Sequence, residues 1–141
     1  MKFFATLFIL TASISASAAG THDCKGLDSI GNLIGATKTL GNVKLAYVST
    51  EEPAAAPDHL LVFIYDKEMG QTCTAISRDR EGNGFGSVNM DSLKSVAYDS
   101  NEGRTFEITV GLPDTDGSNG PKPTQIRFRT NSLTGKVSIL N

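Results

Sequence analysis

The sequence predicts a small all-β domain behind an N-terminal signal peptide, and three features point to this fold class. Apolar residues recur with a period of two, the spacing that places alternate side chains on one face of a β-strand. The apolar segments are short, and turns rich in glycine or proline separate them. Short connections of this kind join antiparallel neighbours, so we expect an antiparallel meander of about eight strands that forms a barrel or a sandwich.

The first 19 residues have the layout of a secretory signal peptide. Lys2 supplies a basic start, the apolar run from Phe3 to Ile14 is too short to span a bilayer, and small residues up to Ala19 form a cleavage site. We therefore divide the chain into a signal peptide, residues 1–19, and a single β domain, residues 20–141. This predicts a secreted or periplasmic protein, and no later apolar run has the roughly 20 residues of a membrane span.

The segment before the first clear strand, Gly26 to Ile34, is the one part of the domain with any helical character. Asp28 is a suitable N-cap for the residues that follow it, but the two glycines in this segment weaken a helix. One short turn of helix is the most that we expect here.

The predicted strands follow in chain order. They are Val43–Tyr47, Leu60–Tyr65, Thr72–Arg78, Phe85–Met90, Lys94–Tyr98, Arg104–Val110, Thr124–Thr130 and Val137–Ile139. The run Leu60–Tyr65 is apolar on both faces, which is typical of a central strand covered on both sides.

The clearest alternation lies in Arg104–Val110. Its residues Phe106 and Ile108 alternate with Thr105, Glu107 and Thr109, so we expect one face in the core and the other in solvent. Taken over all the strands, the side chains predicted to be least exposed are Phe63, Phe106, Ile108, Ile126, Phe128 and Ile139.

Cys24 and Cys73 both lie in the exported part of the chain. An oxidising compartment favours a disulfide between them, and closing a loop of 49 residues stabilises a fold by about 4 kcal/mol in the chain-entropy model. One alternative joins the two cysteines with His22 and His59 in a Cys₂His₂ metal site, although only His22 and Cys24 have a local spacing. A pair of free thiols is the other alternative.

Charge narrows the range of partners. Without Lys2, the 13 basic residues fall to 12, against 15 acidic ones, and the domain has no basic run. This balance argues against nucleic acid and against anionic membrane surfaces. Four arginines, Arg78, Arg80, Arg127 and Arg129, would form a basic patch if their strands were neighbours. They are interpreted as parts of solvated strand faces, because acidic residues interleave with the first pair. The remaining partner class is a protein or another component of the cell envelope.

Two long loops are the predicted binding surfaces. The first, Ser49–His59, contains two prolines, and the second, Gly111–Pro123, contains three. We expect both to project from the scaffold, because binding sites on β folds are usually carried by long loops and prolines cannot donate to a sheet. The candidate binding residues are Glu51, Glu52, His59, Asp114, Asp116 and Lys122.

Within the second loop, Asp114, Asp116 and Asn119 form a candidate calcium site. Hard oxygen ligands at alternating positions are how calcium loops hold their ion. The loop departs from the EF-hand pattern because Gly117 follows Asp116 directly and no closing glutamate is present. A plain mobile turn is the alternative, since Asp-Gly and Asn-Gly are favoured in any turn. Calcium is the one cofactor considered.

Catalytic chemistry is poorly supplied, and we predict no catalytic residue. The domain has two histidines, lacks the G-x-S-x-G motif and has no tryptophan. His59 is expected to be an exposed residue at the end of a loop. The run from Gly82 to Gly86 is interpreted as a hairpin turn, because no helix or P-loop lysine follows it.

The leading functional expectation is an exported, non-enzymatic β domain that binds a protein or envelope component through its long loops. The alternative is a carrier of small apolar ligands in a barrel interior, and a small secreted hydrolase is the third reading. The content of the interior separates the first two, because a carrier needs an apolar cavity and a binding domain needs a packed core.

Overall fold

The computed structural model describes residues 19–27, 33–50, 56–68, 70–114 and 119–140. This part of the chain contains nine strands and no helix, so the all-β class is confirmed. The strands are β1 (Gly20–Asp23), β2 (Leu33–Leu40), β3 (Val43–Ser49), β4 (Asp58–Asp66), β5 (Gly70–Ser77), β6 (Ser87–Asp99), β7 (Gly103–Leu112), β8 (Lys122–Asn131) and β9 (Lys136–Leu140). The predicted signal peptide lies almost entirely outside the described residues.

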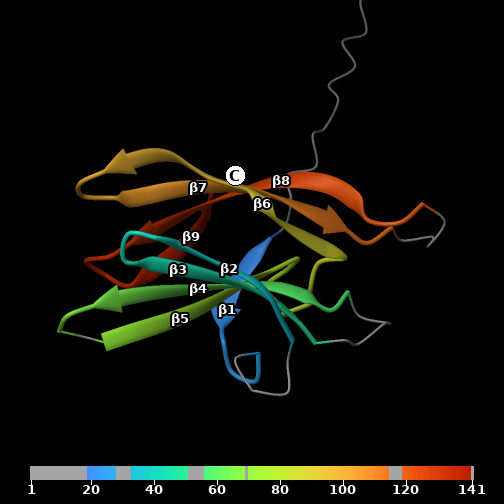
Figure 1. Cartoon of the computed structure of the whole chain (residues 1–141), viewed down its shortest axis with the longest axis horizontal. Helices are drawn as coiled ribbons and strands as arrows, with labels where there is room; N and C mark the ends of the chain where they lie inside the picture. Colours follow the sequence, from blue (N-terminus) through green and yellow to red (C-terminus); the bar gives the residue numbers. More distant parts are fainter. Residues whose placement is uncertain (1–18, 28–32, 51–55, 69, 115–118, 141) are drawn as a thin grey trace, which may run out of the picture.

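The strands form two antiparallel sheets that lie one above the other (Figure 1). The first has the order β1-β5-β4-β3-β2 and the second β6-β7-β8-β9. The predicted antiparallel meander therefore exists in two pieces, β2 to β5 and β6 to β9, while β1 pairs with β5 at the far edge. The pairing of the described strands does not close into a ring, so the predicted alternative of a barrel is not found and the arrangement is sandwich-like.

The main core lies between the two sheets. Its buried side chains come from both of them and from Phe85, which lies between β5 and β6. They include Leu45, Leu60, Val62, Ile76, Phe106, Ile108, Ile126 and Phe128. The rings of Phe106 and Phe128 stack with their centroids 5.3 Å apart. This packing follows from the alternation in β7 and β8, which the register places side by side.

A second, smaller apolar cluster covers the outer face of the first sheet. Cys24, Ala46, Val48, Leu61 and Ala75 form it, with Phe63 packed against it. Strand β4 thus contributes to both clusters and lies in the middle of its sheet, as the run Leu60–Tyr65 predicts. The prediction of deep burial is wrong for Phe63 and for Ile139, which are half-buried, because Phe63 faces this thinner cluster and Ile139 lies on the edge strand β9.

The predicted disulfide joins Cys24 and Cys73, whose Cα atoms are 5.8 Å apart. It ties the residue after β1 to the middle of β5, within the smaller cluster. Because the bond uses both sulfur atoms, the Cys₂His₂ metal site and the free thiols are wrong. A disulfide is consistent with an extracellular location.

The segments Phe85–Met90 and Lys94–Tyr98 are one strand, β6, and not two. The register of β6 against β7 is interrupted between Asn89 and Lys94. The Oδ1 of Asn89 accepts the backbone N–H groups of Asp91 and Ser92, and the Ser92 hydroxyl accepts the N–H of Thr109 at 2.8 Å. These side chains bridge the interruption, which lets both Met90 and Leu93 face the core.

The sequence patterns do not predict β1 and β2. The expected helical turn, Gly26–Ile34, lies partly outside the described residues, and its last two residues begin β2. Pairing with β3 outweighs the local preferences of this segment. Gly35 lies against the Tyr47 ring, where a Cβ would come within 2.2 Å of the ring.

The outer face of β7 is also less exposed than predicted. Glu107 is buried, because Lys94 and Arg127 lie over it at 2.8 and 2.7 Å. Its hydrogen bonds to Lys94 and then to Arg127 lower the pKa of the carboxyl group. Thus the polar face of the second sheet is a network of paired charges.

Candidate functional site

Three connections gather at one end of the molecule, which we call the loop end (Figure 1). They are β3–β4, β5–β6 and β7–β8, and their described residues are 50 and 56–57, 78–86, and 113–114 and 119–121. Backbone hydrogen bonds fasten their bases: Phe85 exchanges two with Asp58, and Gly86 donates to Gly111 at 2.7 Å. Residues 85–86 therefore join the two sheets, and the loops stand on a fixed base.

The second long loop is shorter than predicted. The pairing of β7 with β8 continues through Gly111 opposite Pro123 and Leu112 opposite Lys122. Pro123 is tolerated there because β9 pairs with β8 only from Arg127 onward, so no second neighbour needs the missing N–H group. Lys122 is therefore a strand residue at the base of the loop.

The prediction that His59 is an exposed loop residue is wrong. His59 is the second residue of β4 and its exposed fraction is 5%.

Its neighbour Asp58 faces the opposite side of the sheet, since successive residues of a strand alternate. Burial and then a hydrogen bond to Asp58 raise the pKa of Tyr47.

His59 belongs to a polar trio with Ser77 and His22. These residues come from the three adjacent strands β4, β5 and β1 and lie on the outer face of the first sheet. The Ser77 hydroxyl lies 2.7 Å from Nε2 of His22 and 2.8 Å from Nδ1 of His59. The two imidazole rings meet edge to face, with centroids 6.4 Å apart.

The hydrogen bonds of this trio run in one direction when both rings are neutral. His22 Nδ1 lies 2.8 Å from the backbone oxygen of Asp23, and a carbonyl only accepts, so this nitrogen carries the proton. His22 Nε2 then accepts the Ser77 hydroxyl proton, and Ser77 accepts the N–H of His59. The Nε2 atom of His59 is left as an acceptor.

Burial, and then repulsion from His22, lower the pKa of His59, while Asp58 acts in the opposite direction. His59 is therefore neutral at pH 7. Ser77 is fully buried, and in the described part of the chain neither imidazole is hydrogen-bonded to a carboxylate. The trio thus lacks the accessible nucleophile and the orienting acid that a serine hydrolase requires.

A pocket of about 370 Å³ opens beside the trio. His22 and His59 line it together with Lys25, Glu81 and the glycine-rich stretch 82–84. Gly84 is required for the close approach of this stretch to the first loop, because a Cβ there would lie 2.0 Å from the backbone oxygen of Ala56. The lining contains both signs of charge, which suits a polar ligand group.

A second pocket, of about 540 Å³, lies at the β7–β8 loop. Asp114 and Lys122, two of the predicted binding residues, line it together with Asn119, a predicted calcium ligand. The Asn119 amide donates to Asp114 at 3.4 Å. The remaining predicted residues Asp116, Glu51 and Glu52 lie outside the described part of the chain, and within that part no group of three acidic, histidine or cysteine residues could hold a metal ion.

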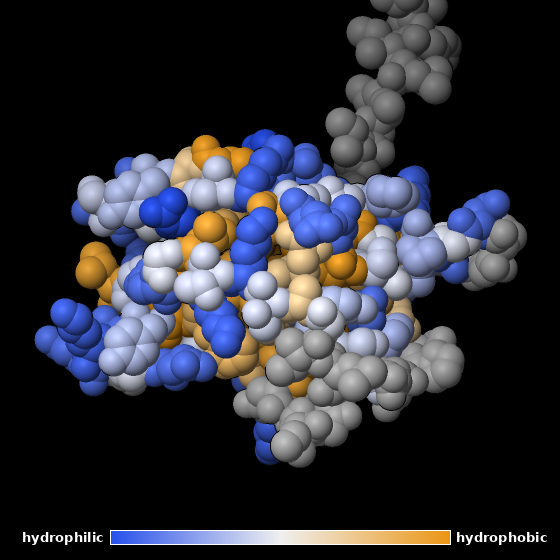
Figure 2. Space-filling view, in the orientation of Figure 1, coloured by the Kyte–Doolittle hydropathy of each residue, from blue (hydrophilic) through white to orange (hydrophobic). Residues whose placement is uncertain are grey.

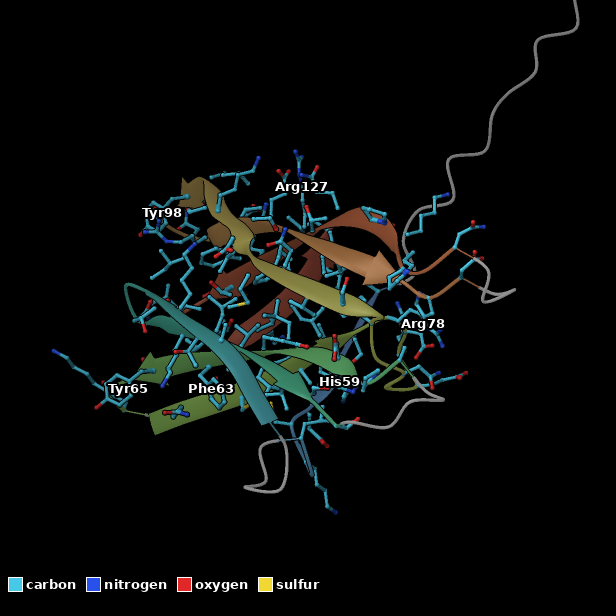
Figure 3. The ribbon with its side chains drawn as sticks, turned by 45° about the vertical axis from the view of Figure 1, so that its right-hand side comes forward. His59, Phe63, Tyr65, Arg78, Tyr98 and Arg127 are labelled. Atoms are coloured by element: carbon cyan, nitrogen blue, oxygen red, sulfur yellow. A yellow bond between two sulfur atoms is a disulfide. The ribbon has the colours of Figure 1, made fainter. Side chains whose placement is uncertain are left out.

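The four arginines do not form one patch. Figure 3 places Arg78 at the loop end and Arg127 on the outer face of the second sheet. Arg127 pairs with Glu107, Arg129 with Glu102 and Arg78 with Asp79. The interpretation as a solvated strand face holds for Arg127 and Arg129 of β8 and is wrong for Arg78 and Arg80, which lie in the β5–β6 connection.

Sequence reasoning missed the trio because no local spacing relates its members. His22 and Ser77 are 55 residues apart, and they meet only because β1 pairs with β5. The single signal available was the presence of two histidines in the whole chain.

The comparisons with known proteins assign no family. No family model matches the sequence, and neither the curated proteins nor the solved structures contain a significant match. Among the described residues, no helix is long and apolar enough to cross a membrane.

Proposed function

We propose that the protein is an exported, non-enzymatic binding domain that holds a protein or cell-envelope component at its loop end. The observation that carries this proposal is the placing of two pockets on either side of one fixed segment. Gly84 lines the first pocket, while Gly86 packs against Pro121, which lines the second. A partner that covers this segment would contact both pockets at once.

The form of the scaffold supports recognition of a macromolecule. The strands on both sides of the β3–β4 and β7–β8 connections are paired up to their ends, and the sequences between them contain prolines. We therefore expect these connections to lose less conformational entropy on binding than proline-free ones. Each pocket alone is small, but together they offer polar and charged groups over an extended surface.

The packed interior favours a binding domain over a carrier. Three phenylalanines, Phe85, Phe106 and Phe128, are fully buried between the sheets with Leu and Ile side chains around them. An apolar ligand would have to displace this core. The hydrolase reading is the least supported, because the Ser77 hydroxyl is enclosed by two histidines and is not accessible to a substrate.

Site-specific photo-crosslinking in the cells that naturally export the protein tests the proposal. A photoreactive residue replaces Glu81 or Asn119 at the loop end, and Asn101 or Lys136 at the opposite end as matched controls, all four being exposed. We expect both loop-end positions to capture the same partner and the controls to capture none of it. Capture of that partner from the control positions alone would overturn the proposal.

A further inference from the structure

The second half of β6 is an open edge of the second sheet. β6 is the edge strand of its sheet, and every residue from Lys94 to Asp99 is exposed. Val96 and Tyr98, with 42% and 68% of their surfaces exposed, belong to the few large apolar or aromatic side chains that the described chain leaves in solvent. Figure 2 shows an apolar patch on the surface where Figure 1 places β6.

The two halves of β6 are protected differently. In the first half, Met90 and Leu93 are buried, and Lys38 of β2 donates from Nζ to the backbone oxygen of Leu93 at 3.2 Å. The lysine places a charge at this part of the edge, and natural proteins commonly use such a charge to prevent an edge strand from pairing with another chain. From Ser95 to Tyr98 the edge carries no lysine and no proline. Lys94 lies over Glu107 on the face of the sheet, at 2.8 Å.

We propose that the segment Lys94–Asp99 pairs in antiparallel fashion with the same segment of a second copy of the chain, so that two four-stranded sheets become one continuous sheet. The charges of the segment argue for this occupant. In a twofold pair centred between Val96 and Ala97, Lys94 lies opposite Asp99 of the second copy, and Asp99 opposite its Lys94. Opposite charges in directly facing positions stabilise strand pairs.

The faces of the sheet agree with this register. Lys94 and Asp99 lie opposite Glu107 and Gly103 of β7, which share one face, so both members of the charged pair are on the same side. Ser95 and Tyr98 lie opposite Phe106 and Arg104, which share the other face. The two pairs that flank the twofold axis therefore join side chains that point the same way, as an antiparallel ladder requires.

The proposed contact between the two copies is small, so we expect the dimer to be weak. The register of β6 shifts between Ser95 and Ala97, so the ladder forms on the two flanks of the twofold axis and not across it. Such an interface buries less than the roughly 1,200–2,000 Å² of stable complexes. We expect a dimer that forms at high concentration, dissociates on dilution and weakens as salt screens the two charged pairs.

The test is sedimentation velocity on the disulfide-bonded protein over a concentration series, with two variants. Val96→Lys places a charge on the open edge and should raise the dissociation constant at least tenfold. Leu133→Lys is the matched control, because Leu133 is 76% exposed, lies in the β8–β9 turn at the same end, and undergoes the same change of charge. We expect its dissociation constant to equal that of the unmodified protein.

Hydrogen exchange provides a readout that needs no variant. The amides of residues 94–99 should gain protection as the concentration of the unmodified protein rises, while those of the β8–β9 turn should not. A protein that stays monomeric at millimolar concentration, equal effects of the two variants, or a dimer whose amides 94–99 exchange as in the monomer would each overturn the proposal. Since the β6 edge lies away from the pockets, the proposal is independent of the loop-end function.

Discussion

The loop end of the molecule differs from the opposite end, which we call the turn end, in the length of its connections and in the side chains that it presents. The loop end has long connections, pockets of about 370 and 540 Å³, and a histidine pair in which His59 is buried and His22 is half-buried. The pockets at the turn end are smaller, about 320 and 290 Å³. The turn end has tight turns such as the one at Gly41, where φ is +65°. It exposes Tyr65, Tyr98 and Leu133, and Figure 3 shows Tyr65 and Tyr98 on the side away from His59 and Arg78.

On the two proposals above, these regions serve two modes of recognition in one small domain. Concave sites lined by polar groups recognise specific donors and acceptors of a ligand. An open strand edge with apolar side chains recognises another strand through its main chain. The topology explains why the two ends differ. In an antiparallel meander every second connection lies at the same end of the sheet, so the long connections can all lie at one end.

Removal of the disulfide should cause the largest loss of stability and should loosen β1, the strand that carries His22. Replacing both Cys24 and Cys73 by alanine should lower the free energy of unfolding by about 2–5 kcal/mol, because the unfolded chain is no longer constrained. Urea denaturation measures this loss. Hydrogen exchange of the double variant should be faster in β1, which carries His22, than in the β6–β7 turn. An equal rise in both regions would contradict a specific role of the disulfide in holding β1.

Removing the shared hydroxyl should have the next largest effect. Ser77→Ala leaves His22 and His59 without the partner that both contact, and an unsatisfied buried polar group costs about 1–3 kcal/mol. The matched control is Ser95→Ala at the turn end, where the hydroxyl is exposed and contacts Arg104. We expect the control to change stability by less than about 0.5 kcal/mol. If thermal denaturation gives similar losses of stability for the two variants, the hydrogen bonds of the trio do not stabilise the fold more than an exposed serine does.

Acid should loosen the loop end before the turn end. The pKa of His59 in the fold is lower than the 6.5 of an unfolded histidine, so the unfolded chain binds the proton more readily. Stability is therefore full above about pH 6.5 and falls as the pH drops toward the lowered pKa, with a slope of at most about 1.4 kcal/mol per pH unit for one group. His59→Asn keeps a donor near Ser77 and removes the titration. The melting temperature of this variant should vary less between pH 7 and 5 than that of the unmodified protein.

Carboxyl groups act in a lower pH range, which separates them from this effect. Hydrogen bonds lower the pKa values of Asp79, Asp99 and Glu107, so their contribution is present above their ordinary values near 4 and is lost below them. A loss of stability confined to pH below 4.5 would assign acid sensitivity to the carboxyl groups and not to His59.

Shortening the β7–β8 loop should have the smallest effect on stability. Replacing residues 113–121 by Gly-Asn-Gly keeps the paired residues Leu112 and Lys122 and removes most of the second pocket. We expect a change of stability within about 1 kcal/mol, since loop length costs little, and loss of the captured partner. Retention of the partner would exclude this loop from the binding surface.

Melting curves with and without calcium on both proteins test the Asp114 site, because a bound ion raises the melting temperature of the long-loop form alone.

The sequence by itself determined the strands that carry strong alternation. In β7 and β8 every second side chain must be buried, so the pattern identifies both the strand and its inner face, as Phe106, Ile108, Ile126 and Phe128 show. The apolar run at Leu60 likewise indicated a central strand, and two cysteines behind a predicted signal peptide indicated their own bond. These features depend on local composition, which a single chain displays directly.

The tertiary structure decided the features that depend on pairing between distant segments. β1 is a short strand of mixed composition that exists because β5 offers it an edge, and β6 continues through an interruption that Asn89 and Ser92 bridge. The same dependence explains why Glu107 is buried and why His22, Ser77 and His59 meet. Strand order and register are set by the sum of many long-range contacts, so neither leaves a local pattern in the chain.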